Sequence, residues 1–177
     1  MIKIRLAEET DLDSILKVIE IAFSDEENKV IMNLVQELSR ETTSPSIKSL
    51  VAEVDNEVIG YVSYSLIFLK SDSNISGYIL APVAVSPEQQ KQGVGSNLLK
   101  SGIEMLTKNG IGVSLVYGDP AYYGQFVFKE EIGRWFVPPY TLQYPFGWTG
   151  MRLNDTPVPE HPIQFECVDA LSKPDLW

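Results

Sequence analysis

Two glycines at the start of a candidate helix are the residues whose types and spacing point most directly to chemistry. Residues 80–99 consist of an apolar stretch, a polar loop, Gly93 and Gly95, and the beginning of an amphipathic segment. A helix start carries unpaired N–H groups and a charge of about +0.5, and glycines remove the side chains that would keep an anion away. This order predicts a diphosphate-binding loop. We expect the phosphates to be held by the backbone amides of Gln90, Lys91, Gln92, Gly93, Val94, Gly95 and Ser96.

Three known layouts of phosphate-binding loops can be compared with this stretch. A P-loop needs Gly, four residues, Gly, then Lys and Ser or Thr, and the chain has no such run. A dinucleotide fingerprint does not fit either, because it needs its first glycine at the strand end and a third glycine at the position that Leu98 occupies. The third layout fits, as Gln90-Lys91-Gln92-Gly93-Val94-Gly95 behind Val83-Ala84-Val85. It resembles motif A of the GNAT superfamily of N-acetyltransferases, which hold the pyrophosphate of acetyl-CoA in this way; a tight turn without ligand is the alternative.

The resemblance also implies where the rest of the coenzyme binds. In GNAT proteins the fourth and fifth strands start side by side and then separate, which opens a slot for the pantetheine arm. Here these strands would be residues 77–85 and 111–117. Pro82 cannot donate to a ladder and so weakens pairing at this point; a simple bulge that binds no ligand is the alternative. The resemblance therefore implies pantetheine contacts from the backbone of Val83, Ala84 and Val85.

A second motif supplies a candidate acid. Residues 116–128 resemble GNAT motif B, in which a tyrosine stands five residues before the Phe of a Gly-Phe pair, so counting back from Phe128 gives Tyr123. The pattern Gly-Asp-Pro-x-Tyr-Tyr-x-x-Phe resembles one bacterial branch of the superfamily, but Val127 occupies the usual Gly position. A phenol of pKa ~10 stays protonated at neutral pH and could protonate the CoA thiolate as it leaves. We therefore expect Tyr123 to be the general acid, with packing against Tyr122 and Phe126 as the alternative.

No general base can be assigned from the sequence. His161, the single histidine, lies in a proline-rich tail and lacks the partners of a metal site. Glu26 and Glu27 are at a predicted helix start, where complementing the helix dipole is the simpler role, and Glu53 is a further option. Water could act as the base instead, so the base stays open. Because His161 lacks partners for a metal site, we predict no metal.

Composition limits the class of protein. With 177 residues, 44% hydrophobic and 21% charged, the chain fits one globular domain with a sizeable core. The formal charge of −10 argues against a nucleic acid as the main partner. No apolar run approaches the ~20 residues of a membrane helix, and residues 1–11 lack the apolar core of a signal peptide. A lone cysteine, Cys167, suits a reducing compartment, so we expect a cytoplasmic protein.

Periodicity predicts the elements that position these motifs. The expected strands are residues 2–6, 49–54, 58–69, 77–85, 111–117, 135–140 and 146–153, with an edge strand at 163–168. The expected helices are residues 10–23, begun by a capping box of Thr10 and Asp13, then 24–38, 94–109 and a short helix opened by Pro120. Residues 55–57 are expected to form the turn of a β-hairpin between the strands 49–54 and 58–69, and a polar turn is expected at residues 70–76.

The order β-α-α-β-β-β-α-β-α-β-β is that of the GNAT fold, an α/β (α+β) acyl-CoA N-acyltransferase fold with a mixed, mostly antiparallel central sheet flanked by helices. We expect one domain over residues 1–177, with a core at 2–153 and a C-terminal extension at 154–177. The resemblance implies an acetyl-CoA-dependent N-acetyltransferase acting on a primary amine of a small molecule or peptide. A non-catalytic acyl-CoA-binding module is the alternative. A homodimer is one option for its assembly.

The acceptor itself is not named by any motif. Six large aromatic residues fall between positions 135 and 148: Trp135, Phe136, Tyr140, Tyr144, Phe146 and Trp148. Such a cluster forms core packing by default, and the rim of a pocket for an apolar or cationic amine is the functional alternative.

Overall fold

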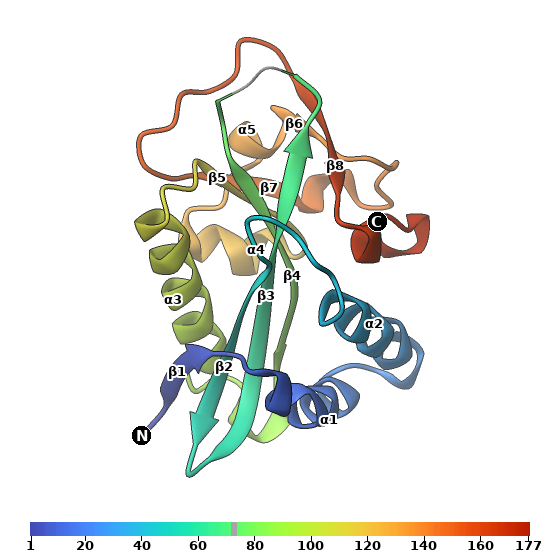
Figure 1. The fold of residues 1–177 in the computed structure, drawn as a ribbon, viewed down its shortest axis with the longest axis vertical. Coiled ribbons are helices and arrows are strands. Elements are labelled where there is room, and N and C mark those ends of the chain that lie inside the picture. Colours follow the sequence, from blue (N-terminus) through green and yellow to red (C-terminus); the bar gives the residue numbers. More distant parts are fainter. Residues whose placement is uncertain (72–73) are drawn as a thin grey trace. The chain divides into compact units, whose positions relative to one another are not determined.

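The computed structural model describes residues 1–71 and 74–177. The strands are β1 Lys3–Leu6, β2 Lys48–Val54, β3 Glu57–Leu69, β4 Gly77–Val85, β5 Val113–Tyr117, β6 Phe136–Val137, β7 Trp148–Arg152 and β8 Ile163–Cys167. The α-helices are α1 Leu12–Ala22, α2 Asp25–Leu38, α3 Val94–Lys108, α4 Pro120–Tyr123 and α5 Glu130–Gly133 (Figure 1). The polar turn expected at residues 70–76 lies partly outside the described residues, since it includes 72 and 73.

The strands form a mixed sheet in the order β1-β2-β3-β4-β5-β7, with β8 paired to both β3 and β6. Among the paired strands, β1–β2, β2–β3, β3–β8 and β5–β7 are antiparallel, whereas β4–β5 and β6–β8 are parallel. The predicted fold class, a mostly antiparallel sheet flanked by helices, is confirmed. No helix in the described part of the chain is both long and apolar enough to cross a membrane.

The chain divides into two compact units. The first consists of Met1–Tyr64 and Pro82–Gly102, and the second of Ser65–Ala81 and Ile103–Trp177. The expectation of one domain over the whole chain stays a prediction, and each unit is described below by itself.

In the first unit, helices cover both faces of the sheet. Ile15 and Ile19 of α1 pack with Val35 of α2 against Val51 and Tyr61 on one face. On the other face a Cβ at Gly60 would lie 3.0 Å from a methyl carbon of Leu98, so the start of α3 packs closely on β3. Side chains alternate between the two faces along a strand, which explains why neighbouring residues 60 and 61 meet different helices.

The predicted hairpin of β2 and β3 is confirmed. Asp55 and Asn56 form its two-residue turn with φ of 51° and 65°. Positive φ at both central positions is typical of a type I′ turn, whose twist suits the flanking strands.

The predicted cap of the first helix is wrong. A capping box of Glu8 and Asp11 belongs instead to the 3₁₀ turn Glu9–Asp11 that precedes α1, where the Glu8 N–H donates to Asp11 Oδ2 at 2.8 Å, and α1 itself begins after Asp11 without a side-chain cap. Arg5 explains this choice, because its guanidinium donates to both oxygens of Asp11, at 2.6 and 2.9 Å, and to Glu53 at 2.8 Å. The carboxylate that is fixed by an ion pair becomes the capping group.

In the second unit, β5 lies between β4 and β7, and its residues from Val113 to Val116 are all buried. It pairs in parallel with β4 from Gly77↔Val113 to Leu80↔Val116, and antiparallel with β7. The strand begins at Val113 and not at residue 111. Asn154 accounts for the difference, because its side-chain amide donates to the Ile111 carbonyl at 3.0 Å and holds that residue in the connection.

One expectation for the second unit is wrong. The strand expected at residues 135–140 is reduced to the two residues of β6, since Pro138 and Pro139 follow and cannot donate to a ladder. The strand expected at residues 163–168 is present as β8, whose first residues pair with β6 through Phe136↔Ile163 and whose last residues pair with the end of β3 through Ile67↔Cys167. The helix α5 was not expected at all.

Candidate active site

The loop between β4 and α3 has a left-handed backbone at the first of its two glycines. Residues 87–89 form a 3₁₀ turn, and Lys91 and Gly93 have φ of 60° and 84°. Positive φ is natural for glycine and uncommon for lysine. A Cβ at Gly93 would meet no atom within 4 Å, so the space in front of this residue is open. Lys91, Gln92 and Gly93 are exposed, which leaves the loop accessible to a ligand.

Six consecutive amides in this loop have no protein acceptor. The first intrahelical bond of α3 runs from the Asn97 N–H to the Gly93 carbonyl, at 2.9 Å. Within the residues that the structure describes, the N–H groups of residues 91–96 donate to no backbone or side-chain oxygen. Unpaired amides at the positive end of a helix, here the 15-residue α3, are the groups that bind anions in proteins, and binding of a diphosphate at this loop stays a prediction. The predicted loop residues are thus brought together, except that the Gln90 N–H is bonded to Pro87 O at 3.3 Å.

The strand before the loop has one feature that the sequence did not show. Gln90 folds back so that its side-chain amide donates to the Val85 carbonyl at 3.1 Å. A carbonyl oxygen has a second lone pair, so Val85 can still accept from a ligand. Val83 and Val85 are half-buried and Ala84 is buried. Pantetheine contacts from these three residues stay a prediction.

Tyr123 is positioned by a short, well-capped helix in the second unit. Asp119 Oδ1 accepts the Ala121 N–H at 2.9 Å, and Pro120 supplies the first helical residue, as predicted. The Tyr123 ring makes edge contacts with Tyr122 and Phe128, at centroid distances of 5.1 and 6.0 Å. These contacts hold the ring, so the packing expected as an alternative is present and leaves the role of the hydroxyl open.

The Tyr123 hydroxyl is free to bond a ligand. The residue is 8% exposed, and no described residue makes a hydrogen bond to its hydroxyl. Burial raises the pKa of Tyr123 well above its ordinary value, and the charges that Tyr122 and Asp119 can carry raise it further. The phenol is therefore fully protonated at physiological pH and available as a proton donor.

The departure from the motif at Val127 has a structural consequence. Val127 adopts φ 69° and ψ 18°, the left-handed region that a glycine would occupy without strain. A β-branched residue there is a genuine outlier. The turn after Tyr123 therefore keeps the backbone shape that a glycine would give, at the cost of strain.

The candidate bases are occupied or exposed. Glu53 pairs with Arg5 and Lys3, and Glu27 accepts the Ser24 hydroxyl at 2.7 Å at the start of α2. Glu26 and His161 are exposed. Among the described residues no group of three or more His, Cys, Asp or Glu side chains could hold a metal ion. A base therefore stays unassigned. The buried thiol of Cys167, whose pKa is raised to about 12 by burial, is inert.

The aromatic cluster separates into two parts. Phe136 and Trp148 are buried, and the Trp148 indole N–H donates to the carbonyls of Gly133 and Phe136 at 3.0 and 2.9 Å. Tyr144 and Phe146 lie on the surface, 53% and 64% exposed, with ring centroids 5.9 Å apart. The core interpretation holds for the first pair, while the second pair is accessible to a partner.

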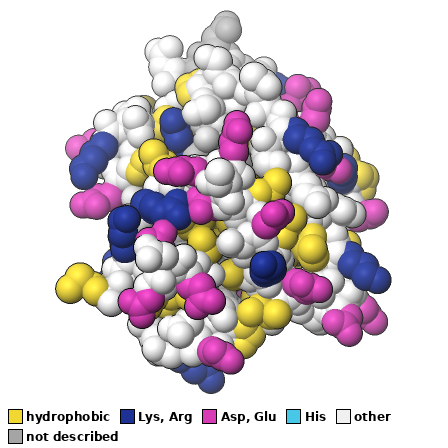
Figure 2. Space-filling view, turned by 60° about the horizontal axis from the view of Figure 1, so that its bottom comes forward, with side chains coloured by type: hydrophobic (Ala, Val, Ile, Leu, Met, Phe, Trp, Pro, Cys, Tyr) yellow, Lys and Arg dark blue, Asp and Glu magenta, His cyan; other side chains and the backbone are white. Residues whose placement is uncertain are grey.

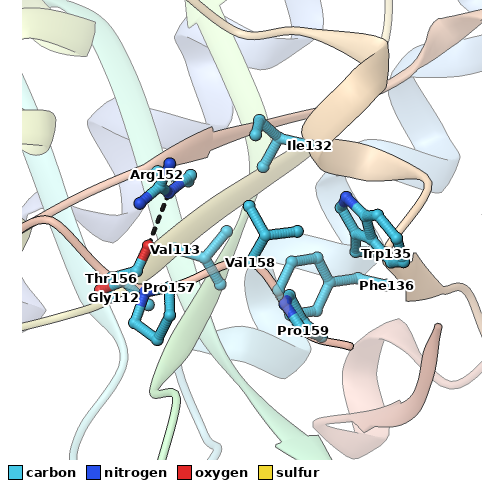
Figure 3. A pocket seen from close by; sticks show the side chains of 10 residues that line it. All are labelled: Gly112, Val113, Ile132, Trp135, Phe136, Arg152, Thr156, Pro157, Val158 and Pro159. Carbon is cyan, nitrogen blue, oxygen red and sulfur yellow. Dashed lines mark hydrogen bonds between the residues drawn. The ribbon is translucent and has the colours of Figure 1, made fainter. Parts of the chain in front are cut away.

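A hollow beside this cluster is too small for a substrate. It is lined by Ile132, Phe136, Val158 and neighbouring residues, and the segment at Thr156 is fastened by the Arg152 Nε–H, which donates to the Thr156 carbonyl at 2.6 Å (Figure 3). Its volume of about 10 Å³ is the space of one water molecule. Acidic and basic side chains alternate over the face drawn in Figure 2, with apolar side chains between them, so this face carries no basic stripe for a nucleic acid.

A family model described as an acetyltransferase (GNAT) domain matches residues 3–130. The chain belongs to the GNAT acetyltransferase family. It is 30% identical over 141 residues to an uncharacterized N-acetyltransferase of Escherichia coli K12, YjhQ, covering 77% of this chain and 75% of YjhQ. It is 28% identical over 106 residues to the uncharacterized N-acetyltransferase YhbS of the same strain, covering 60% of each chain.

Solved structures show the same fold. The structure of Escherichia coli YhbS in complex with CoA superposes with a TM-score of 0.84 at 22% identity, covering 97% of this chain and 92% of YhbS. A GNAT family acetyltransferase from Brucella melitensis in complex with acetyl-CoA gives a TM-score of 0.69 at 24% identity, covering 97% and 99%.

Sequence reasoning missed two features of the site region. Gln90 was expected to contribute only its backbone amide, and the pattern gave no sign of its side-chain bond to the preceding strand. Trp177 was not expected to have a role, yet its indole N–H donates to Leu171 O at 3.0 Å and its ring packs with Tyr117, Tyr140, Trp148 and Phe165. Long-range aromatic packing of this kind leaves no periodic signal.

Proposed function

We propose that this protein transfers the acetyl group of acetyl-CoA to a primary amine of a small molecule or peptide. The observation that carries the proposal is the run of six unpaired amides at residues 91–96 in a chain of the GNAT family. Two proteins of the same fold have structures with CoA or acetyl-CoA bound. A diphosphate would accept hydrogen bonds from these amides, and Val83, Ala84 and Val85 would bind the pantetheine amides through their backbone.

The proposed reaction is a direct attack of the neutral amine on the thioester carbonyl. A C–N bond forms, the C–S bond breaks, and the products are an N-acetyl amine and CoA. The amine gives up one proton to water, and the Tyr123 hydroxyl donates its proton to the leaving sulfur and regains one from solvent. The neutral state of Tyr123 supports this role, because only a protonated phenol can act as an acid.

Finer assignments belong to the same proposal. The Gly118-Asp119-Pro120 sequence before Tyr122 and Tyr123 supports membership of the bacterial branch with that motif, which is part of the proposal. One domain, a cytoplasmic location and the choice of acetyl over longer acyl groups are parts of the proposal that follow the family pattern. A homodimer stays one option.

Replacing Tyr123 by Phe tests the chemical step. We expect Tyr123→Phe to fold and to lose ~10²–10⁴-fold in turnover, because a general acid contributes about that much. Tyr122→Phe is the matched control, since it removes a hydroxyl from the adjacent half-buried ring. The measurement is release of free CoA with acetyl-CoA and a panel of amines and peptides. Full turnover by Tyr123→Phe would remove the assignment.

The second candidate is an acyl-CoA-binding module without turnover. It shares the loop but needs no proton donor, so the free hydroxyl of Tyr123 favours the enzyme. If CoA and acetyl-CoA bind but no amine in the panel releases CoA, the binding module gains the advantage. A nucleotide-binding protein is tested by thermal shift with ATP and NAD, because a specific ligand stabilises the folded state by mass action.

A further inference from the structure

A hollow in the first unit lies apart from every residue used so far. It is bounded by the end of β1, the start of α1, the end of α2 and the start of β2, and we call it the β1–α2 hollow. Its volume is about 580 Å³, within the ~300–1,000 Å³ typical of small-molecule sites. None of residues 83–96 lines it, so it is distinct from the proposed coenzyme loop.

The inside of the hollow combines an apolar wall with neutral hydroxyls. The wall consists of Leu12, Ile15, Val35 and Leu38. Beside it, Tyr61 Oη and Ser49 Oγ lie 3.2 Å apart, and Ser49 Oγ lies 3.1 Å from Ser63 Oγ. Burial raises the pKa of Tyr61, so its hydroxyl stays neutral. Such a surface suits an apolar body that carries uncharged hydrogen-bonding groups, such as a peptide amide.

The rim carries opposite charges on separate elements. Glu8 and Glu9 precede α1, whereas Arg40 and Glu41 follow α2 and Lys48 begins β2, so the second side of the rim has two cations and one carboxylate. Within the described residues Glu9 and Arg40 make no ion pair, and Lys48 Nζ bonds the Ser46 hydroxyl at 3.0 Å. By contrast, the nearby Arg5 is fully engaged by carboxylates. A hollow with unpaired acid and base at its rim complements a ligand whose own charges are opposite and separated.

We propose that the β1–α2 hollow binds a short zwitterionic peptide with apolar side chains. Its ammonium lies at Glu8 and Glu9, its carboxylate at Arg40 and Lys48, and its side chains on the apolar wall. A peptide fits better than a free amino acid, because its two charges are separated by an amide that the hydroxyls can bond. The proposal does not depend on acetyl transfer.

The test is calorimetric titration with the dipeptide Leu-Leu, without CoA. We expect saturable binding that weakens about tenfold in Glu9→Gln and in Arg40→Gln, the loss of one charge-assisted hydrogen bond. Both side chains are exposed, so both variants should fold. Glu20→Gln and Lys29→Gln are matched controls on exposed positions of α1 and α2 outside the hollow, and should bind like the parent protein.

Peptides blocked at one end test whether the ammonium lies at Glu9 and the carboxylate at Arg40. N-acetyl-Leu-Leu should bind the parent about tenfold more weakly and be insensitive to Glu9→Gln, while Leu-Leu amide should be insensitive to Arg40→Gln. No heat with Leu-Leu at millimolar concentration would overturn the proposal. So would equal binding of the blocked peptides, or unchanged binding by both variants. If Leu-Leu inhibits acetyl transfer in competition with the acceptor amine, the hollow is part of the acceptor site. If turnover is unchanged when Leu-Leu is added, the hollow is a separate site.

Discussion

A negative charge at the start of α3 should separate stability from coenzyme binding. Ser96 is the third residue of α3 and half-buried, next to Gly95 in the run of unpaired amides. Aspartate in the first turn of a helix stabilises it by about 0.3–1 kcal/mol through the helix dipole. The same carboxylate would lie beside a bound diphosphate and repel it. Ser96→Asp is therefore expected to raise stability and to lower affinity for CoA.

The size of the second effect follows from Coulomb's law. At a separation of ~5 Å and an effective dielectric constant of ~40–80, each pair of like charges costs about 1–2 kcal/mol. A diphosphate with two charges then costs about 2–3 kcal/mol, which weakens binding ~30- to ~150-fold. The penalty should shrink as salt is raised, because exposed charges are screened over ~10 Å at 0.1 M.

The control is Ser96→Asn, which has nearly the same shape and no charge. Chemical denaturation gives the stability of both variants, and calorimetry gives their affinity for CoA at two salt concentrations. Equal affinity in Ser96→Asp and Ser96→Asn, with both proteins folded, would refute the placement of the diphosphate at the start of α3.

Three further predictions concern stability. Val127→Gly should raise the free energy of unfolding by about 0.5–1 kcal/mol. It relieves ~1–2 kcal/mol of left-handed strain and adds ~0.5–1 kcal/mol of entropy to the unfolded chain. A lower free energy of unfolding in urea would contradict the strain. Gly102→Ala should cost about 1–3 kcal/mol, because a Cβ there would overlap the buried Tyr64 ring; an unchanged midpoint would show that the ring can move. Hydrogen bonds from Arg5 lower the pKa of Asp11, so the stability from this pair is present above the carboxylate's unfolded pKa and is lost as pH falls through its lower folded pKa. Asp11→Asn should therefore reduce the loss of stability at acid pH, measured by denaturation at a series of pH values. An unchanged loss at acid pH would count against the pair.

Local signals in the sequence were sufficient for the elements that carry the site. Gly93 and Gly95 indicated a loop and helix start, Asp119 and Pro120 indicated the short helix that holds Tyr123, and Asn56 indicated the hairpin turn. Each of these residues acts on its own few neighbours, where turn and cap chemistry is decisive. The fold class followed because these elements occur in one order.

The features that sequence reasoning missed depend on residues far apart in the chain. The capping box of the 3₁₀ turn before α1 includes Asp11, which is held by Arg5, and Arg5 is itself held by Glu53 of another strand. The pairing of β8 with both β3 and β6 depends on the path of the chain and not on the alternation of polar and apolar residues within β8. Side-chain bonds such as Gln90 to Val85 require the loop to be folded first. Propensity and periodicity contain no information on such contacts.

The central claim is that the unpaired amides of residues 91–96 bind the diphosphate of coenzyme A. Calorimetric titration of the parent protein with CoA tests it most directly, with ATP and NAD as comparison ligands. We expect saturable binding of one CoA per chain and far weaker heats with ATP and NAD. The absence of any heat with CoA and acetyl-CoA at millimolar concentration would contradict the claim.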